Sequence, residues 1–201
     1  LPAGLALTIV VADNNPVSQR EAYVEPALRG MPWPVVYGHE PNAGYSNARN
    51  KAIELAMGIE ADALLFVDDD MIVDPGWLAA HLRSLEHFGG DVVNGRIFGI
   101  RERFPHGAKL EKCGAGNVSF RRHLVDPAGL GLRFDPAFNK TGTEDQAFFR
   151  AATAKGADIR QSDWPQIFNY YGRAEMPEDE GINKMLVTAS MHQNEVARVR
   201  A

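Results

Sequence analysis

Three consecutive carboxylates, Asp68, Asp69 and Asp70, directly follow the apolar run 63–67 (Ala-Leu-Leu-Phe-Val). A short apolar run bounded by turn residues is typical of a strand buried on both faces, as in a parallel sheet. The carboxylates then lie at the carboxyl end of the strand, where open α/β sheets bind ligands. Asp68 and Asp70 point to the same side of an extended segment, and such oxygen ligands suit Mg²⁺ or Mn²⁺. An acidic helix flank or a solvated turn is the alternative.

A second set of polar residues ends another apolar run. Residues 5–12 are predicted to form a buried strand, and Asp13, Asn14 and Asn15 follow it. Their side chains are able to bind the ribose or base edges of a nucleotide. The alternative, of equal weight, is an Asx-turn that closes the strand.

Two predicted helices begin with polar residues. Ser46 is expected to cap the first, and Gly44 before it leaves the first amides of the helix open to an anionic ligand. Arg49 lies in the first turn, at the positive end of the helix dipole, which hints at a role other than helix stability. A salt bridge to a carboxylate is the alternative. Thr143 is expected to cap the second helix, and Gly156 to end it.

The carboxylates of that second helix, Glu144 and Asp145, occupy its first turn. Acidic residues there complement the helix dipole, which by itself explains their presence. A further helix is predicted to begin at Asp74 and Pro75, with His81 on its apolar stripe as a hydrogen-bonded, half-buried residue rather than a ligand.

Other elements complete the framework. Strands are predicted at 35–37, 92–98, within the glycine-rich segment 113–122, at 158–160 and at 166–171. Asn117 follows the glycines, which permit close approach of a ligand to the backbone. A final helix is expected from Pro177, with apolar positions at Ile182, Met185, Leu186 and Ala189.

The composition excludes several classes of protein. The chain has 201 residues, enough for one domain with a large core, and 45% of them are apolar. A net charge of −5 without a dense Lys/Arg run argues against nucleic acid as a partner. Cys113 is the single cysteine, so an internal disulfide is excluded and a reducing, cytoplasmic setting is expected. No apolar run approaches the roughly 18 residues of a membrane span, but association with the inner face of the membrane stays open.

Taken together, five segments in order resemble family 2 glycosyltransferases of the GT-A fold: 10–15, 42–50, 66–70, 114–122 and 142–145. Each is weak alone, and the five together are specific over about residues 5–160. The resemblance implies one α/β domain with a mostly parallel, Rossmann-like sheet and helices on both faces. The nucleotide half is expected at about 1–75, the acceptor half at about 76–175 and a C-terminal helix at about 177–201.

The activity implied is inverting, metal-dependent transfer from a nucleotide-sugar, a UDP-sugar first of all, to a saccharide or lipid-linked acceptor. The residues implied for the nucleotide-sugar are Asp13, Asn15, Asn42, Arg49, Asp68, Asp69 and Asn117. Asp70 and Asp68 would hold Mn²⁺ or Mg²⁺, and His192 is a weaker metal candidate. Asp145, with Glu144 second, would take the acceptor proton. Trp164 is placed on the acceptor side with Asn117.

The resemblance departs from the family at the front, where residues 5–13 match the second strand of the family and not its first. A strand–helix unit on the order of 35 residues is therefore expected to be missing, which would leave the sheet one strand short. A non-catalytic nucleotide-sugar binding module, or an inactive fragment, is thus the alternative. A nucleotidyltransferase is a third reading, but its glycine-rich phosphate loop is not visible.

Overall fold

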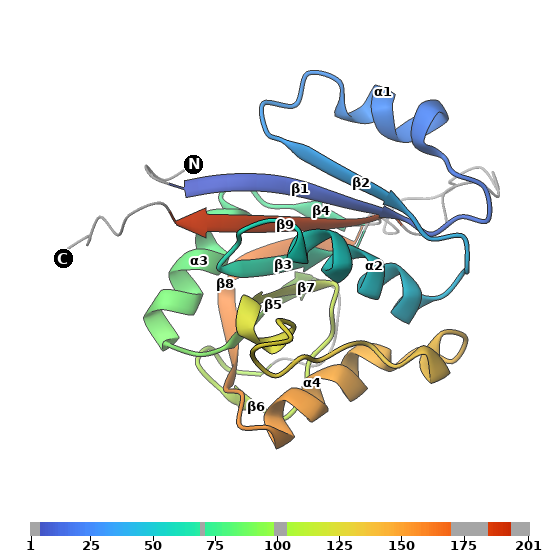
Figure 1. Ribbon diagram of the computed structural model, residues 1–201. Helices are drawn as coiled ribbons and strands as arrows, with labels where there is room; N and C mark the ends of the chain where they lie inside the picture. Colours follow the sequence, from blue (N-terminus) through green and yellow to red (C-terminus); the bar gives the residue numbers. More distant parts are fainter. Residues whose placement is uncertain (1–4, 69–70, 99–103, 170–184, 194–201) are drawn as a thin grey trace.

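A single mixed sheet with helices on both faces forms the protein (Figure 1). The computed structural model describes residues 5–68, 71–98, 104–169 and 185–193. Within them the strand order is β2-β1-β9-β3-β7-β5-β8-β4, and β6 pairs with β8. None of the helices in these ranges has the length and apolar character needed to cross a bilayer.

The central strand β3 (Ala63–Val67) is buried along its whole length, as predicted. Its side chains alternate between two cores. Leu64 and Phe66 pack with apolar residues of α2 (Tyr45–Met57) and α4 (Glu144–Ala154). The other three residues of β3 pack with the apolar stripe of α3 (Trp77–Phe88) on the opposite face. Helices therefore cover both faces because the strand is apolar at every position.

The remaining strands are β1 (Leu5–Asp13), β2 (Val35–His39), β4 (Met71–Val73), β5 (Val92–Phe98), β6 (Lys109–Leu110), β7 (Asn117–Arg121), β8 (Ile159–Asn169) and β9 (Met185–Gln193). Only two pairs among them, β1–β2 and β5–β8, are parallel. The expectation of a mostly parallel sheet is corrected accordingly: β3 is antiparallel to both of its neighbours, β7 and β9. The two strands predicted at 158–160 and 166–171 are one strand, β8, whose pairing with β5 shifts register between Asn94 and Arg96.

The prediction of a C-terminal helix is wrong for residues 185–193, which form β9. This strand runs antiparallel to both β1 and β3 and lies between them, as the red arrow in Figure 1 shows. Residues 185–193 form a strand despite the helical spacing of their apolar residues, because they pair with the backbones of both β1 and β3. Without β9, each of these strands would have a buried edge of unpaired backbone groups. The described sheet is therefore continuous from β2 to β4, with β9 between β1 and β3. The expected absence of a first strand–helix unit stays a prediction. Residues 177–184 and 194–201 lie outside the described ranges.

Thr143 occupies its predicted position before α4, but the predicted side-chain caps of the helices are not formed. Helix α2 is preceded by Gly44, α3 by Gly76 and α4 by Thr143, and none of these has a side-chain cap. Ser46 does not cap α2 because its hydroxyl donates to the carbonyl of Asp135 (2.7 Å). Gly156, with φ of +95°, follows the end of α4 as predicted.

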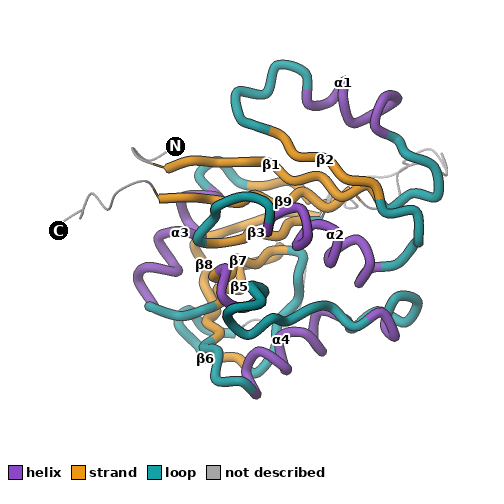
Figure 2. Tube along the Cα trace, in the orientation of Figure 1, coloured by secondary structure: helices purple, strands orange, loops and turns teal. Residues whose placement is uncertain are grey.

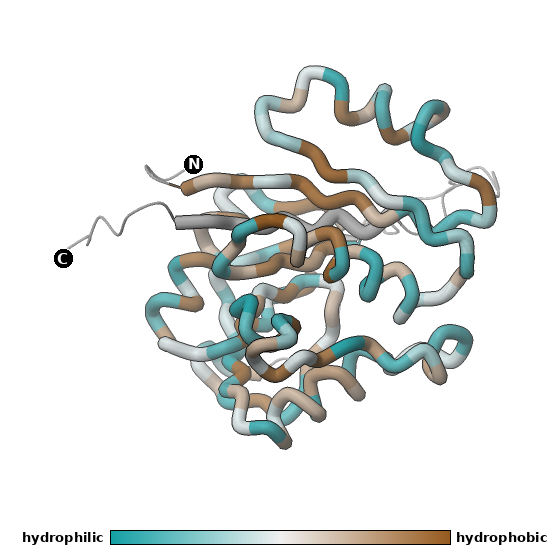
Figure 3. Tube along the Cα trace, in the orientation of Figure 1, coloured by the Kyte–Doolittle hydropathy of each residue, from teal (hydrophilic) through white to brown (hydrophobic). Residues whose placement is uncertain are grey.

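Short helical segments and loops connect the larger elements. They are Arg20–Val24 and α1 (Glu25–Leu28), Arg122–Leu124 and Pro136–Phe138. Figure 2 shows that the long connection from β7 to α4 is mostly loop. In Figure 3 the apolar residues concentrate along the central strands and the polar ones along the outer loops.

Candidate active site

A buried ion cluster joins the end of β3 to the start of α4. Arg49, from the first turns of α2, donates to a carboxylate oxygen of Glu144 and to Oδ1 of Asp68 (3.2 Å). The Arg49 and Glu144 side chains are 8% and 4% exposed, and Asp68 is 33% exposed. The salt-bridge alternative for Arg49 is therefore confirmed, and the pairing explains a cation at the positive end of a helix.

Two atoms of this cluster have no hydrogen-bond partner. Oε2 of Glu144 and Nε of Arg49 are buried and unpaired within the part of the chain that the structure describes. A buried unpaired polar group costs about 1–3 kcal/mol of stability, more when charged. Such exceptions are uncommon in folded proteins and call for an explanation, of which a catalytic role is one.

A glycine-rich loop, Gly114 to Gly116, lies close to two carboxylates, Asp68 of this cluster and Asp145 of α4. A Cβ placed on Gly116 would lie 2.8 Å from Oδ2 of Asp68, and one on Gly114 would lie 3.5 Å from Oδ2 of Asp145. Because residue 116 has no side chain, Asp68 occupies its position without a steric clash. Asp145 is half-buried in the first turn of α4, and its Oδ1 accepts from the Gln146 amide (2.6 Å).

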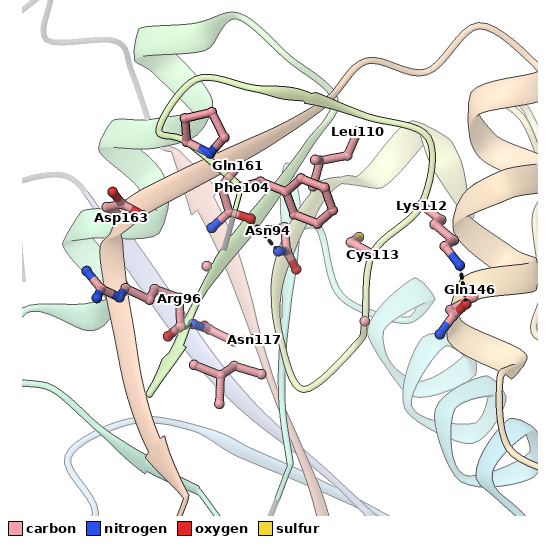
Figure 4. A pocket seen from close by; sticks show the side chains of 14 residues that line it. Asn94, Arg96, Phe104, Leu110, Lys112, Cys113, Asn117, Gln146, Gln161 and Asp163 are labelled. Carbon is pink, nitrogen blue, oxygen red and sulfur yellow. Dashed lines mark hydrogen bonds between the residues drawn. The ribbon is translucent and has the colours of Figure 1, made fainter. Parts of the chain in front are cut away.

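Next to Gly114 opens a pocket of about 530 Å³, drawn in Figure 4. Its walls are β5, the chain from residue 104 to Gly114, and polar residues of β8 and α4. The volume lies within the 300–1,000 Å³ usual for small-molecule sites. Cys113 also lines it, but burial, and secondarily the charge of Asp145, raises the pKa of the Cys113 thiol. The thiol therefore stays protonated and is a poor nucleophile.

At the end of β1, Asp13 is occupied by its own turn. Its Oδ1 accepts from the amide and side chain of Asn15, and its Oδ2 from the Gln19 amide and the Tyr37 hydroxyl (both 2.6 Å). Burial alone would raise the pKa of Asp13, but the hydrogen bonds from Tyr37, Gln19 and Asn15 outweigh it and lower that pKa. The Asx-turn alternative is therefore confirmed, and both oxygens are already used.

The neighbouring Asn14 is a positioning residue, a role that the sequence did not reveal. Its side chain donates to the carbonyls of Glu40 (2.8 Å) and Asn42 (2.9 Å) and accepts from the Gly44 amide (2.8 Å). Asn14 thus ties the end of β1 to the chain that leads into α2. Asn42 is exposed, and both its amide and its side chain donate to Oε1 of Glu40.

The start of α2, where amides open to an anionic ligand were expected, is partly occupied by the protein itself. Asn139 lies against it, and its Oδ1 accepts from the Asn47 amide (3.1 Å). A Cβ on Gly44 would lie 2.4 Å from the Asn139 side chain. One helix-end amide is thus taken by a protein group.

Asn117 is the centre of a second buried network. Its Oδ1 accepts from Trp77 Nε1 (2.7 Å) and contacts His81 Nε2 (2.8 Å), and its Nδ2 donates to the carbonyls of Arg96 (3.0 Å) and Pro165 (3.2 Å). The amide of Asn117 therefore has no position left for a ligand, which corrects its predicted role. Its contacts instead fix the strand that follows the glycine loop.

His81 is fully buried between Asn117 and Ser119 Oγ (2.9 Å). Burial lowers the pKa of His81 to about 4, so the ring is neutral near pH 7. The prediction of a hydrogen-bonded histidine is confirmed. Trp164 is absent from the pocket lining and packs near α3, with Arg83 over its ring at 4.3 Å. Its expected place on the acceptor side stays a prediction.

The chain that carries this arrangement is similar to known proteins in sequence and in fold. The sequence profile described as "Glycosyl transferase family 2" matches residues 3–143. The chain belongs to glycosyl transferase family 2.

Relatives of this family 2 domain include one curated protein and several solved structures. It is 31% identical over 175 residues to the succinoglycan biosynthesis protein ExoM of Rhizobium meliloti (strain 1021), covering 79% of this chain and 55% of ExoM. The structure of S. aureus TarS 1-349 with UDP-GlcNAc has a TM-score of 0.61 at 19% identity, over 87% of this chain and 52% of TarS 1-349. GalNAc-T7 with UDP, GalNAc and Mn²⁺ gives 0.60 at 11% identity, over 80% and 37%. These likenesses confirm the GT-A fold, and the chain spans about half the length of ExoM and of TarS 1-349.

For a metal ion, the family 2 domain offers carboxylates of the right chemistry. Asp68 directly follows β3 beside the glycine loop, and a carboxylate of this kind suits Mg²⁺ or Mn²⁺. Asp69 and Asp70 lie outside the described residues, and within those residues no group of three His, Cys, Asp or Glu could hold a metal. The predicted metal role of Asp70 therefore stays a prediction. His192 lies on β9, not on the helix expected to carry it.

Proposed function

We propose that this domain transfers a sugar, with inversion, from a UDP-sugar to a saccharide or lipid-linked acceptor. The observation that carries the proposal is that one glycine loop contacts both carboxylates, Asp68 at Gly116 and Asp145 at Gly114, where the pocket begins. In this arrangement Asp68 marks the donor side, Asp145 is the basic group, and the pocket next to Gly114 receives the acceptor. The solved complex of TarS with UDP-GlcNAc supports a UDP-sugar, and the name of ExoM supports a role in polysaccharide assembly.

Asp145 is the base in this proposal. The acceptor oxygen attacks the anomeric carbon on the face opposite the diphosphate and gives its proton to Asp145. The bond from that carbon to the phosphate oxygen breaks, and the electron pair leaves with UDP. Glu144 is a poorer candidate because its carboxylate is buried against Arg49. Its role is to hold the first turn of α4, and hence Asp145, against the end of β3.

A divalent cation fits the same proposal. Asp70 and Asp68 would hold Mn²⁺ or Mg²⁺, which supplies charge neutralisation for the departing diphosphate. Arg49 maintains the position of Asp68 through their ion pair (3.2 Å). Asn15 and Asn42 remain proposed nucleotide contacts, because they lie at the ends of β1 and of the turn before α2.

The test is Asp145→Asn, which keeps the shape of the side chain and removes the base. Release of UDP from UDP-sugars, with water or saccharides as acceptor, is expected to fall by about 10²–10⁴-fold. Calorimetric binding of UDP in the presence of Mn²⁺ should stay nearly unchanged. The matched control is Asp126→Asn, since Asp126 is paired with Arg122 away from the pocket.

Each outcome separates the proposal from its alternatives. Unchanged turnover by Asp145→Asn removes the base assignment. UDP-sugar binding by the wild type without any turnover favours the non-catalytic binding module. If titration of UDP, GDP and TDP shows no binding at all, the donor site itself is wrong.

A further inference from the structure

The pocket beside Asp145 carries a positive charge that the transfer chemistry does not require. We propose that it selects an acidic acceptor, in which Arg96 binds an anionic oxygen group, a carboxylate or a phosphate, on the part of the acceptor remote from the base. This inference rests on the proposed function and deepens it, because it names the chemical class of the acceptor.

Among the described residues Arg96 has no oxygen partner, in contrast to three arginines that form ion pairs. Arg49, Arg122 and Arg160 are each paired with a carboxylate. The guanidinium of Arg96 has neither a carboxylate nor a carbonyl within hydrogen-bonding distance among the residues that the structure describes. It lies over the ring of Phe98, whose centroid is 4.8 Å away. Its five N–H donors are therefore open along its edge, in the fork that suits carboxylate or phosphate.

The structure also holds Arg96 in place. Phe98, beneath the guanidinium, stacks on Phe168 with ring centroids 4.5 Å apart and planes 1° apart. The backbone carbonyl of Arg96 accepts from Asn117 (3.0 Å), which fixes β5 at this point. A close approach makes this possible, because a Cβ on Gly95 would lie 2.3 Å from Asn117 Nδ2. A cation fixed before binding loses less entropy when it binds an anion.

The opposite end of the pocket lies next to the base. Lys112 donates to Oε1 of Gln146 (2.7 Å), the residue after Asp145. Figure 4 shows Lys112 and Gln146 on one side of the pocket and Arg96 on the other, with Asn94 and Gln161 between them. An acceptor whose reacting hydroxyl lies at Asp145 therefore reaches Arg96 with its distant part.

The charge of the pocket contrasts with that of the chain. Its described lining contains two cations, Arg96 and Lys112, and one carboxylate, Asp163, whereas the whole chain carries a net charge of −5. Asp163 forms no salt bridge with any described cation, so it does not neutralise Arg96 by direct pairing. The Asp163 carboxylate should weaken anion binding. Its removal in Asp163→Asn should therefore strengthen anion binding, the opposite of the effect of removing Arg96.

The experiment compares two disaccharides of equal size, cellobiose and cellobiouronic acid, with the protein saturated with UDP and Mn²⁺. Binding is followed by ligand-observed NMR titration. The acid is expected to bind about tenfold more tightly, as one charge-assisted contact allows, and added salt should reduce the difference. In Arg96→Gln the two ligands should bind equally, and in Asp163→Asn the preference should increase. Arg29→Gln, at an exposed arginine outside the pocket, is the matched control.

A second pair of probes, glucuronate and glucose 6-phosphate, identifies the anionic group. The group that Arg96 binds is the one carried by the probe whose binding is weakened more by Arg96→Gln. Equal binding of the two disaccharides by the wild type overturns the inference, and so does the absence of binding of either disaccharide. A preference for the acid that persists in Arg96→Gln also overturns it. UDP binding is measured in parallel. Its loss in the wild type contradicts the proposed function, whereas intact UDP binding without acid preference contradicts the acidic acceptor only.

Discussion

Two buried polar networks flank the glycine loop, and they are built in opposite ways. The network around Asn117 is neutral, and all four hydrogen-bonding positions of that amide are filled. The cluster around Arg49 is charged, and it leaves Nε of Arg49 and Oε2 of Glu144 without partners among the described residues. The first network is what a protein needs in order to hold strands in register. The unpaired atoms of the second network lower the stability of the fold beside the site, as is common where activity requires a destabilised active site.

The largest effect is expected from breaking the charged cluster. Arg49→Met leaves Glu144 buried without its cation, which should lower the free energy of unfolding by about 3–5 kcal/mol. Urea denaturation followed by circular dichroism measures the loss. The double variant Arg49→Met/Glu144→Gln removes the uncompensated charge and should recover much of it. A loss below about 1 kcal/mol in the single variant would show that the pair is not buried as described.

A smaller loss is expected from emptying the neutral network. Asn117→Ala leaves the Trp77 and His81 donors and two carbonyls unpaired, so the free energy of unfolding should fall by about 3 kcal/mol. Turnover should also fall because the glycine loop precedes Asn117, while UDP binding persists. Asn94→Ala is the control, since Asn94 makes a single bond to Gln161 (2.7 Å) at the pocket wall. Equal losses in the two variants would contradict a central role for Asn117.

Acid should weaken the neutral network selectively, through His81. Its folded-state pKa, about 4, is below the ordinary value of 6.5. Between these values the unfolded state binds more protons than the folded one, so stability falls as the pH falls through this window. The loss from His81 between pH 8 and pH 5 is about 2 kcal/mol. His81→Gln should remove this component from the pH profile of unfolding, and an unchanged profile would contradict a neutral buried ring.

The sequence predicted the local features of the site. The buried strand at residues 63–67 and the helix end at Gly156 are as expected because each depends on neighbouring residues alone. The position of Asp145 in the first turn of α4 was predicted for the same reason. The fold family followed from five motifs in order, which makes motif order more informative than any single motif.

Features set by distant contacts could not be predicted. Glu144 and Arg49 are 95 residues apart in sequence, so no local pattern reveals that one neutralises the other. Residues 185–193 have helical spacing, but they form β9 because β1 and β3 offer two strand edges. Ser46 is a good cap by type, and its hydroxyl bonds Asp135 instead, 89 residues away. Arg96 carried no motif, and only its open guanidinium beside the pocket draws attention to it.

The turn around Asp13 is a third case, charged yet fully occupied, and it can show whether charge or missing partners governs the difference. Tyr37→Phe removes one hydrogen bond to Asp13 Oδ2 (2.6 Å) and leaves the Gln19 amide in place. The pKa of Asp13 is lowered in the folded state, so its contribution to stability is present above its unfolded pKa and is lost in acid. Tyr37→Phe should therefore cost about 1 kcal/mol at neutral pH, and less as Asp13 becomes protonated.

Comparison of urea denaturation at neutral and acid pH checks this expectation, with Tyr23→Phe as control because Tyr23 is half exposed (50%) on the segment before α1. UDP affinity should change little, since the turn retains Asn15 and Gln19 as partners of Asp13. A tenfold loss of UDP affinity would instead place the Asp13 carboxylate in contact with the nucleotide. In that outcome an occupied, charged network would be functional as well, and missing partners would no longer distinguish the site from the framework around it.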